Sequence, residues 1–150
     1  MMRGRQDNVK RADTLMRLKR FRVDELKRRL TTLEEMRADA ERKLSDLEES
    51  VERERQRSND SDIGRLAFPS FLRSIDARRE NLRSTLKELD RERSLVDTDL
   101  TAVLEELRGL EFATEQQQKR AEELEAHRAR SRIEELALVR HLRKHALRSA

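Results

Sequence analysis

The side chains with the clearest capacity for chemistry are three histidines near the C-terminus, His127, His141 and His145. His141 and His145 are four residues apart, so a helix would place both imidazoles on one face. A structural zinc site needs four ligands, and its histidines are oriented by further hydrogen bonds. No third ligand is evident at a suitable spacing. We therefore expect no metal site and interpret the pair as part of a basic helix end that interacts favourably with the helix dipole.

Other residue patterns that carry catalysis are missing from the sequence. Gly4, Gly64 and Gly109 are too far apart to form the glycine-rich turn of a P-loop or of a dinucleotide-binding fold. The chain has no cysteine, which excludes disulfide bonds, thiolate zinc sites and cysteine nucleophiles. We expect a protein that is not an enzyme and that binds no cofactor and no small-molecule ligand.

The composition favours long helices over a globular core. Of the 150 residues, 44% are charged, 35% are hydrophobic and 3% are aromatic. A globular domain of this length normally needs a thick apolar core and loops rich in glycine and proline. This chain has only three glycines and one proline. Such a composition also permits disorder, so the periodicity of the apolar residues has to decide between the two.

Apolar residues recur at alternating steps of three and four from Met16 to Val51, and again from Leu72 to Leu124. This spacing is the heptad pattern of coiled-coil strands. Neither helix could bury its apolar seam alone, so we expect the two helices to pair with each other. The seam residues that we assign are Val23, Leu26, Leu30, Leu33, Leu44, Leu47, Leu86, Leu89, Val96, Leu100, Val103 and Leu107.

A cluster of turn-forming residues separates the two seams. Residues 59–62 (Asn-Asp-Ser-Asp) favour turns and helix ends, because their side chains bond to nearby backbone groups. Pro69 is best tolerated in the first turn of a helix, which predicts that the second helix starts there. The predicted elements are a frayed segment at 1–8, a first helix at 9–58, an elbow at 59–68 and a second helix at 69–146.

The predicted fold class is all-α, a long antiparallel two-helix coiled-coil hairpin that forms a single domain over residues 1–150. Folding at the elbow places residue 10 opposite about residue 115, where the second seam turns polar. We therefore expect residues 116–150 to overhang as a basic helical tail with a weaker apolar stripe.

Arg37 and Arg93 interrupt the two seams. An unpaired buried arginine is costly, so we expect both side chains to extend toward water beside acidic neighbours. A role in fixing the register, at some cost in stability, is the alternative.

Charge is distributed unevenly along the chain. Residues 1–20 carry seven basic and two acidic side chains, and residues 127–150 carry the same numbers. Residues 21–126 carry 21 basic and 27 acidic side chains. A hairpin would bring both basic termini to one end, which suits a partner with a negative surface, although charge runs also serve simply as solvated helix faces. The acidic middle and the scarcity of aromatic residues argue against nucleic acid as the partner.

The longest apolar run is Leu-Ala-Leu-Val at residues 136–139. This run is too short for a membrane span or for the core of a signal peptide. We expect a cytoplasmic protein.

Two segments are more specific than ordinary heptad sequence. The first is residues 12–25, Ala-Asp-Thr-Leu-Met-Arg-Leu-Lys-Arg-Phe-Arg-Val-Asp-Glu. The second is Phe-Pro-Ser-Phe-Leu at residues 68–72, followed by Arg-Arg-Glu-Asn-Leu at residues 78–82. Together with the hairpin layout, these segments resemble the flagellar export protein FliJ family in its alphaproteobacterial form, over nearly the whole chain.

The resemblance implies a non-enzymatic component of the flagellar type III export apparatus. Proteins of this family are similar to the central stalk of rotary ATPases. They insert a coiled coil into the export ATPase ring, contact the export-gate membrane protein and escort export chaperones during flagellum assembly. Such a protein would be cytoplasmic and peripherally associated with the inner face of the cell membrane at the flagellar base.

The resemblance also suggests where the gate protein would bind. The family's gate-contacting face lies early in the second helix, and the matching positions here are Phe71, Ile75 and Leu82. Arg78 stands where the family would have a small residue. We add Phe68, because Phe68 and Phe71 are two of only four aromatic residues and lie where the hairpin has little else to bury them against. Exposed aromatic residues of this kind are typical anchors for a partner. Packing of both rings over the elbow is the alternative.

The basic end of the hairpin is the expected binding site for the export ATPase. Charge at an interface mainly steers the encounter, so an apolar contact has to accompany it. The candidate residues are Leu15, Leu18 and Phe21, which are apolar, and Arg17, Lys19 and Arg20, which are basic.

A generic cytoplasmic coiled-coil scaffold or dimerisation protein is the alternative function. A stalk is expected to be a monomeric hairpin when free, whereas a scaffold would dimerise along its length.

Overall fold

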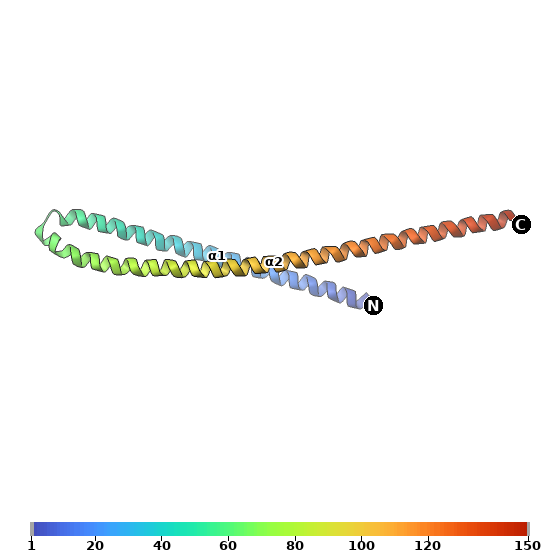
Figure 1. Cartoon of the computed structure of the whole chain (residues 1–150), viewed down its shortest axis with the longest axis horizontal. Coiled ribbons are helices and arrows are strands. Elements are labelled where there is room, and N and C mark those ends of the chain that lie inside the picture. The colour runs from blue at the N-terminus through green and yellow to red at the C-terminus, as the bar shows by residue number, and fades with distance from the viewer. Residues whose placement is uncertain (1, 150) are drawn as a thin grey trace. The chain divides into compact units, whose positions relative to one another are not determined.

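The computed structural model describes residues 2–149 as two α-helices joined by a short turn (Figure 1). Helix α1 spans Met2–Ser58 and helix α2 spans Asp62–Ser149. No strand occurs within residues 2–149, so the predicted all-α class is confirmed. Residues 1 and 150, the ends of the predicted frayed segment and of the predicted tail, lie outside the described residues.

Residues 18–105 form one compact unit, in which α1 and α2 pack side by side and run antiparallel (Figure 1). This arrangement confirms the predicted antiparallel hairpin. The residues before 18 and those from 106 onward form a second unit, which is described separately below. The assignment of the whole chain to a single domain stays a prediction.

The core of the first unit is a single row of apolar side chains on each helix. Leu33 is the most buried of them, with 1% of its surface exposed. Charged residues fill the positions between, because each helix turns only one narrow face toward the other. The buried apolar residues of this unit are Val23, Leu26, Leu33, Ala40, Val51, Ile75 and Leu89. The remaining assigned seam residues of this unit are half-buried.

Beside this seam, the ion pairs that join the two helices include four between residues 29 and 93. The distances from arginine nitrogen to carboxylate oxygen are 2.7 Å for Arg29–Glu92, 3.4 Å for Arg93–Glu34, 3.4 Å for Arg37–Asp90 and 2.8 Å for Arg79–Glu48. Each pair joins residues far apart in sequence, so together they oppose a sliding of one helix along the other.

The two arginines that interrupt the seams extend outward as expected. The side chains of Arg37 and Arg93 are 39% and 42% exposed, and each reaches an acidic residue on the opposite helix. Arg37 also lies 3.5 Å from Glu41 on its own helix. Both side chains are thus partly exposed, while the Nε of Arg37 is itself buried without a hydrogen-bond partner.

The turn between the helices is shorter than the predicted elbow at residues 59–68. Ser61 caps α2: its hydroxyl accepts a hydrogen bond from the Gly64 amide at 3.0 Å, and its carbonyl accepts the first helical bond from the Arg65 amide at 3.2 Å. Asp62 adds a negative charge in the first turn, where the helix dipole favours it. These local bonds allow α2 to start at Asp62 rather than at Pro69.

Pro69 consequently lies inside α2 instead of at its start. A proline there has no amide hydrogen to donate to the carbonyl of Arg65, four residues earlier, and its ring crowds that carbonyl. The helix nevertheless continues, because this first part of α2 packs against the end of α1: Ile75 and Val51 are buried, and Leu72 is half-buried. The sequence prediction gave the local cost of Pro69 more weight than this tertiary packing.

The second unit contains the start of α1 and the remainder of α2. α1 is helical from Met2, so the segment predicted to fray at 1–8 is helical over its described part. Four of residues 2–8 are good helix formers, namely Met2, Arg3, Arg5 and Gln6, whereas Gly4, Asp7 and Asn8 are weaker ones.

The packing within this second unit extends only a short way. Met16 is buried and Leu107 is 8% exposed, and the Thr114 hydroxyl lies 4.0 Å from the Met16 sulfur. Met16 therefore lies opposite Thr114, so the pairing is shifted by several residues from the predicted match of residue 10 with about residue 115. From residue 117 to residue 149 every side chain is exposed except Ser131, which is half-buried. This stretch is the helical overhang, and it continues to Ser149 rather than ending at 146.

Candidate interaction surfaces

Near the start of α1, apolar side chains form a stripe that lies outside the seam. Met16, Lys19 and Val23 occupy the packing face of α1, and their burial ranges from half-buried to buried. Residues that fall between these steps must point elsewhere on the helix. Leu18 and Phe21, in the first unit, are 61% and 65% exposed. These two side chains lie three residues apart, and so they are neighbours on the outer surface of the helix.

The other predicted ATPase-binding residues differ in their surroundings. Leu15 is 43% exposed and Arg17 is exposed, and both belong to the second unit. Arg20 is exposed, whereas Lys19 is half-buried at a seam position. Both Lys19 and Arg20 take part in interactions within the chain. Of this set, Leu18 and Phe21 therefore contribute least to the packing of the hairpin.

The predicted gate-binding residues are mostly part of the packing. Ile75 is 4% exposed, and Phe68, Phe71 and Leu82 are half-buried. The rings of Phe68 and Phe71 stack on each other, with centroids 6.5 Å apart and an interplanar angle of 27°. The expectation that the two phenylalanines are exposed anchors is thus corrected, because each ring is covered in part by the other and by the packed start of α2.

A shallow groove of about 390 Å³ crosses the two helices near Leu82. Its apolar floor is formed by Leu47 of α1 and Leu82 of α2, and its rim is polar or charged. The rim residues are Lys43, Asp46, Arg78 and Asn81. The sequence analysis assigned Leu47 to the seam and Leu82 to the gate-binding face but did not predict the groove, which depends on the register between the helices.

Arg79 follows the groove residue Arg78 in α2 and is the most enclosed arginine of the four interhelical ion pairs described above, with its side chain 17% exposed. It donates hydrogen bonds to Glu48 of α1 at 2.8 Å and to Asp76 of its own helix at 3.0 Å. Its Nε is buried without a hydrogen-bond partner. The guanidinium of Arg79 is therefore held at a fixed place in the hairpin by the carboxylates of Glu48 and Asp76.

The histidines of the tail are the remaining candidates for chemistry. The rings of His141 and His145 lie 6.3 Å apart between centroids and are tilted by 50°, so the two side chains share one side of the helix as their spacing predicts. Within residues 2–149, no three His, Asp or Glu side chains gather closely enough to hold a metal ion. None of the described helices is both long enough and apolar enough to cross a membrane.

Comparisons with known proteins found no match. A scan against protein-family models gave no matching family, and searches of curated proteins and of solved structures gave none either.

Proposed function

We propose that this chain is a non-enzymatic, stalk-like component of the flagellar type III export apparatus. In this proposal it binds the export ATPase ring and the export-gate membrane protein, and it escorts export chaperones. It acts at the inner face of the cell membrane at the flagellar base. The proposal starts from the resemblance of residues 12–25, 68–72 and 78–82 to the FliJ family.

The observation that carries the proposal is the exposure of Leu18 and Phe21, the apolar residues at the centre of the first of these segments. They are 61% and 65% exposed beside a run of basic residues. A leucine and a phenylalanine on the outer face do not contribute to the packing of the hairpin. Single exposed apolar residues are common on proteins. Two adjacent ones beside basic residues suit a protein–protein contact in which charge speeds the encounter and burial of the apolar side chains stabilises the complex.

The gate-binding face is supported by a different feature. The groove at Leu47 and Leu82 offers a small apolar floor with a charged rim, within the part of α2 where the family contacts its gate protein. Because Leu82 lines this groove, whereas Ile75, Phe68 and Phe71 do not, we assign the contact to Leu82 with the rim residues Arg78 and Asn81.

A pull-down of the full chain against the cognate export ATPase and the cytoplasmic domain of the gate protein tests the proposal. Substituting Leu18→Gln together with Phe21→Gln should weaken ATPase binding about tenfold or more and leave gate binding unchanged. Arg78→Glu together with Asn81→Lys should have the opposite effect. Leu95→Gln, at a leucine that is 67% exposed elsewhere on α2, serves as the control and should change neither. Failure of the parent chain to bind either partner would reject the proposal.

A coiled-coil scaffold that dimerises remains the second candidate, because Met36 and Leu95 are 48% and 67% exposed in the paired region. A second copy packed along the hairpin would cover such residues. In that case Leu95→Gln would reduce the solution mass of the protein, whereas the stalk proposal predicts no change.

A further inference from the structure

The end of α2, residues 136–149, has two chemically different faces. Leu136, Val139 and Leu142 follow one another at steps of three, and Ala146 continues the same face four residues later. Arg140, Lys144 and Arg148 follow one another at steps of four on the other side, with His141 and His145 beside them. Leu138 lies with the apolar face, and the segment contains no aspartate or glutamate. We call residues 136–149 the basic amphipathic segment.

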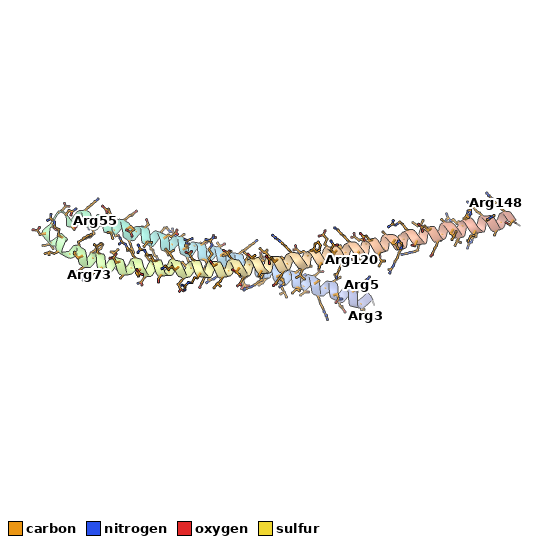
Figure 2. The ribbon with its side chains drawn as sticks, in the orientation of Figure 1. Arg3, Arg5, Arg55, Arg73, Arg120 and Arg148 are labelled. Carbon is orange, nitrogen blue, oxygen red and sulfur yellow. The ribbon has the colours of Figure 1, made fainter. Side chains whose placement is uncertain are left out.

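No side chain of this segment is buried or half-buried. Leu136, Leu138 and Leu142 are 65%, 58% and 57% exposed. Arg148, labelled in Figure 2, marks the end of this segment. An amphipathic helix with no intramolecular partner presents its apolar face to whatever the molecule meets.

We propose that the basic amphipathic segment binds the surface of an anionic lipid membrane, with its helix axis in the membrane plane. The apolar face would enter the boundary between headgroups and acyl chains, and the basic face would remain among the lipid phosphates. Arg143 lies within the apolar face, four residues after Val139 and three before Ala146, and its long side chain can reach back to the headgroups. This inference does not depend on the proposed function, because it rests only on the tail.

The chemistry of the segment favours lipid over the other negatively charged partners. A nucleic acid binder would be expected to interleave aromatic residues with its basic ones, and none of the four phenylalanines lies beyond residue 112. A protein groove typically takes a bulky aromatic anchor from the helix that it binds. A membrane surface needs an apolar face flanked by cations, and residues 136–149 provide one, with Arg143 as the one cation on that face.

The expected binding is weak and reversible. Each lysine or arginine near an anionic surface contributes a modest attraction that falls off within a Debye length. The apolar face consists of a few aliphatic side chains and lacks tryptophan and phenylalanine. The segment is already helical in the free chain, so binding requires no folding of a disordered peptide.

Co-sedimentation of the full chain with lipid vesicles tests the proposal. The chain should bind vesicles of phosphatidylcholine mixed with phosphatidylglycerol and should not bind phosphatidylcholine alone, and binding should weaken as salt is raised. Reversing Arg140, Lys144 and Arg148 to glutamate should reduce the binding constant about a hundredfold or more. Leu138→Gln together with Leu142→Gln should reduce it about tenfold or more, because the apolar contact is lost.

Two matched variants control for total charge and for exposed leucines. Arg3, Arg5 and Arg11 are exposed, and their reversal to glutamate makes the same change in net charge at the other terminus. The binding constant of that variant for vesicles should fall by about threefold or less, since charges beyond a Debye length from the bound segment are screened. Leu66→Gln with Leu95→Gln replaces two leucines that are 82% and 67% exposed, and it should bind like the parent. Circular dichroism of each variant verifies that the helices are intact.

Several results would overturn the proposal. These are no binding to anionic vesicles at low salt, equal binding to both lipid compositions, and equal losses in the tail variants and their controls. Displacement of the chain from vesicles by short duplex DNA, with the Leu138→Gln and Leu142→Gln variant binding as tightly as the parent, would instead identify a general polyanion site.

Discussion

Gly64 and Gly109 are both helical glycines, but their surroundings give them different roles. A Cβ added at Gly64 would lie 2.9 Å from the Ser61 hydroxyl oxygen and 3.0 Å from the Ser58 Cα, whereas a Cβ added at Gly109 would meet no atom within 4 Å. The Ser61 hydroxyl is the cap of α2, and the Ser58 Cα belongs to the backbone at the end of α1. The tight turn therefore requires a residue without a side chain at position 64.

We predict opposite effects of alanine at these two glycines. Gly109→Ala should stabilise the chain by about 0.5–1 kcal/mol, because alanine favours an exposed helix interior over glycine. Gly64→Ala should destabilise it by about 1 kcal/mol, because the gain in propensity is outweighed by the close contact and the disturbed cap. Thermal melts followed by circular dichroism measure both changes. An equal increase in melting temperature for both would show that the turn is not as tight as described.

Leu33 and Met36 provide a second pair at the residue scale, three residues apart on α1. Leu33 is 1% exposed and Met36 is 48% exposed. Leu33→Ala should cost about 2–4 kcal/mol, because it removes a buried side chain from a seam that has little room to collapse. Met36→Ala should be within about 0.5 kcal/mol of neutral. Urea denaturation compares the two, and a similar loss at both positions would contradict the seam.

The ion pairs across the hairpin differ in how strongly they are shielded from solvent. The Arg79 side chain is 17% exposed, while Arg29 and Glu92 are 49% and 50% exposed. A double-mutant cycle on Glu48 and Arg79 should give a coupling energy of about 1 kcal/mol. The same cycle on Arg29 and Glu92 should give about 0.5 kcal/mol or less, because solvent screens the exposed pair. Equal coupling energies would mean that the enclosure of Arg79 has no energetic consequence.

At the scale of the helical element, Pro69 is the residue of α2 that is least compatible with the interior of a helix. It is the eighth residue of the helix, seven positions after Asp62 at its start. Pro69→Ala should stabilise the chain by about 2 kcal/mol, because it restores a backbone hydrogen bond of the helix. The higher conformational entropy of the unfolded alanine variant offsets part of this gain. Ser70→Ala, at the exposed neighbouring position, is the control and should be nearly neutral. Destabilisation by Pro69→Ala would indicate that α2 begins at residue 69 after all.

The helices themselves were predictable from the sequence because their signal is periodic and long. Seam positions such as Leu26, Leu89 and Leu107 follow from steps of three and four, and all three are buried. The start of α2 was not predictable in the same way. Ser61 and Pro69 are both common at helix starts, and the choice between them depends on packing at the start of α2 that no local pattern contains.

The candidate surfaces were predictable only in part, for a related reason. Leu18 and Phe21 fall off the seam in sequence, and they are exposed as that spacing implies. Phe68 and Phe71 also looked like free aromatics, but they are half-buried because they stack on each other at the turn. The groove beside Leu82 depends on which residue of α1 lies opposite, and periodicity alone does not determine that register.

At the scale of the whole molecule, the account requires one chain to supply both strands of its coiled coil. The interhelical pairs Arg29–Glu92 and Arg79–Glu48 join α1 and α2 of the same chain. The seam of each helix is used by the other, so a second copy is not needed to bury Leu33 or Leu89. A stalk that enters a ring is expected to have this single-chain construction, whereas a scaffold would gain its stability from a partner copy.

The solution mass is the most direct test of this central claim. Multi-angle light scattering of the full chain, repeated over a wide range of protein concentrations, should give the single-chain mass of 17.8 kDa throughout. A mass twice as large, or one that falls toward the single-chain value on dilution together with a loss of helical signal, would show that the helices pair between chains and would contradict the account.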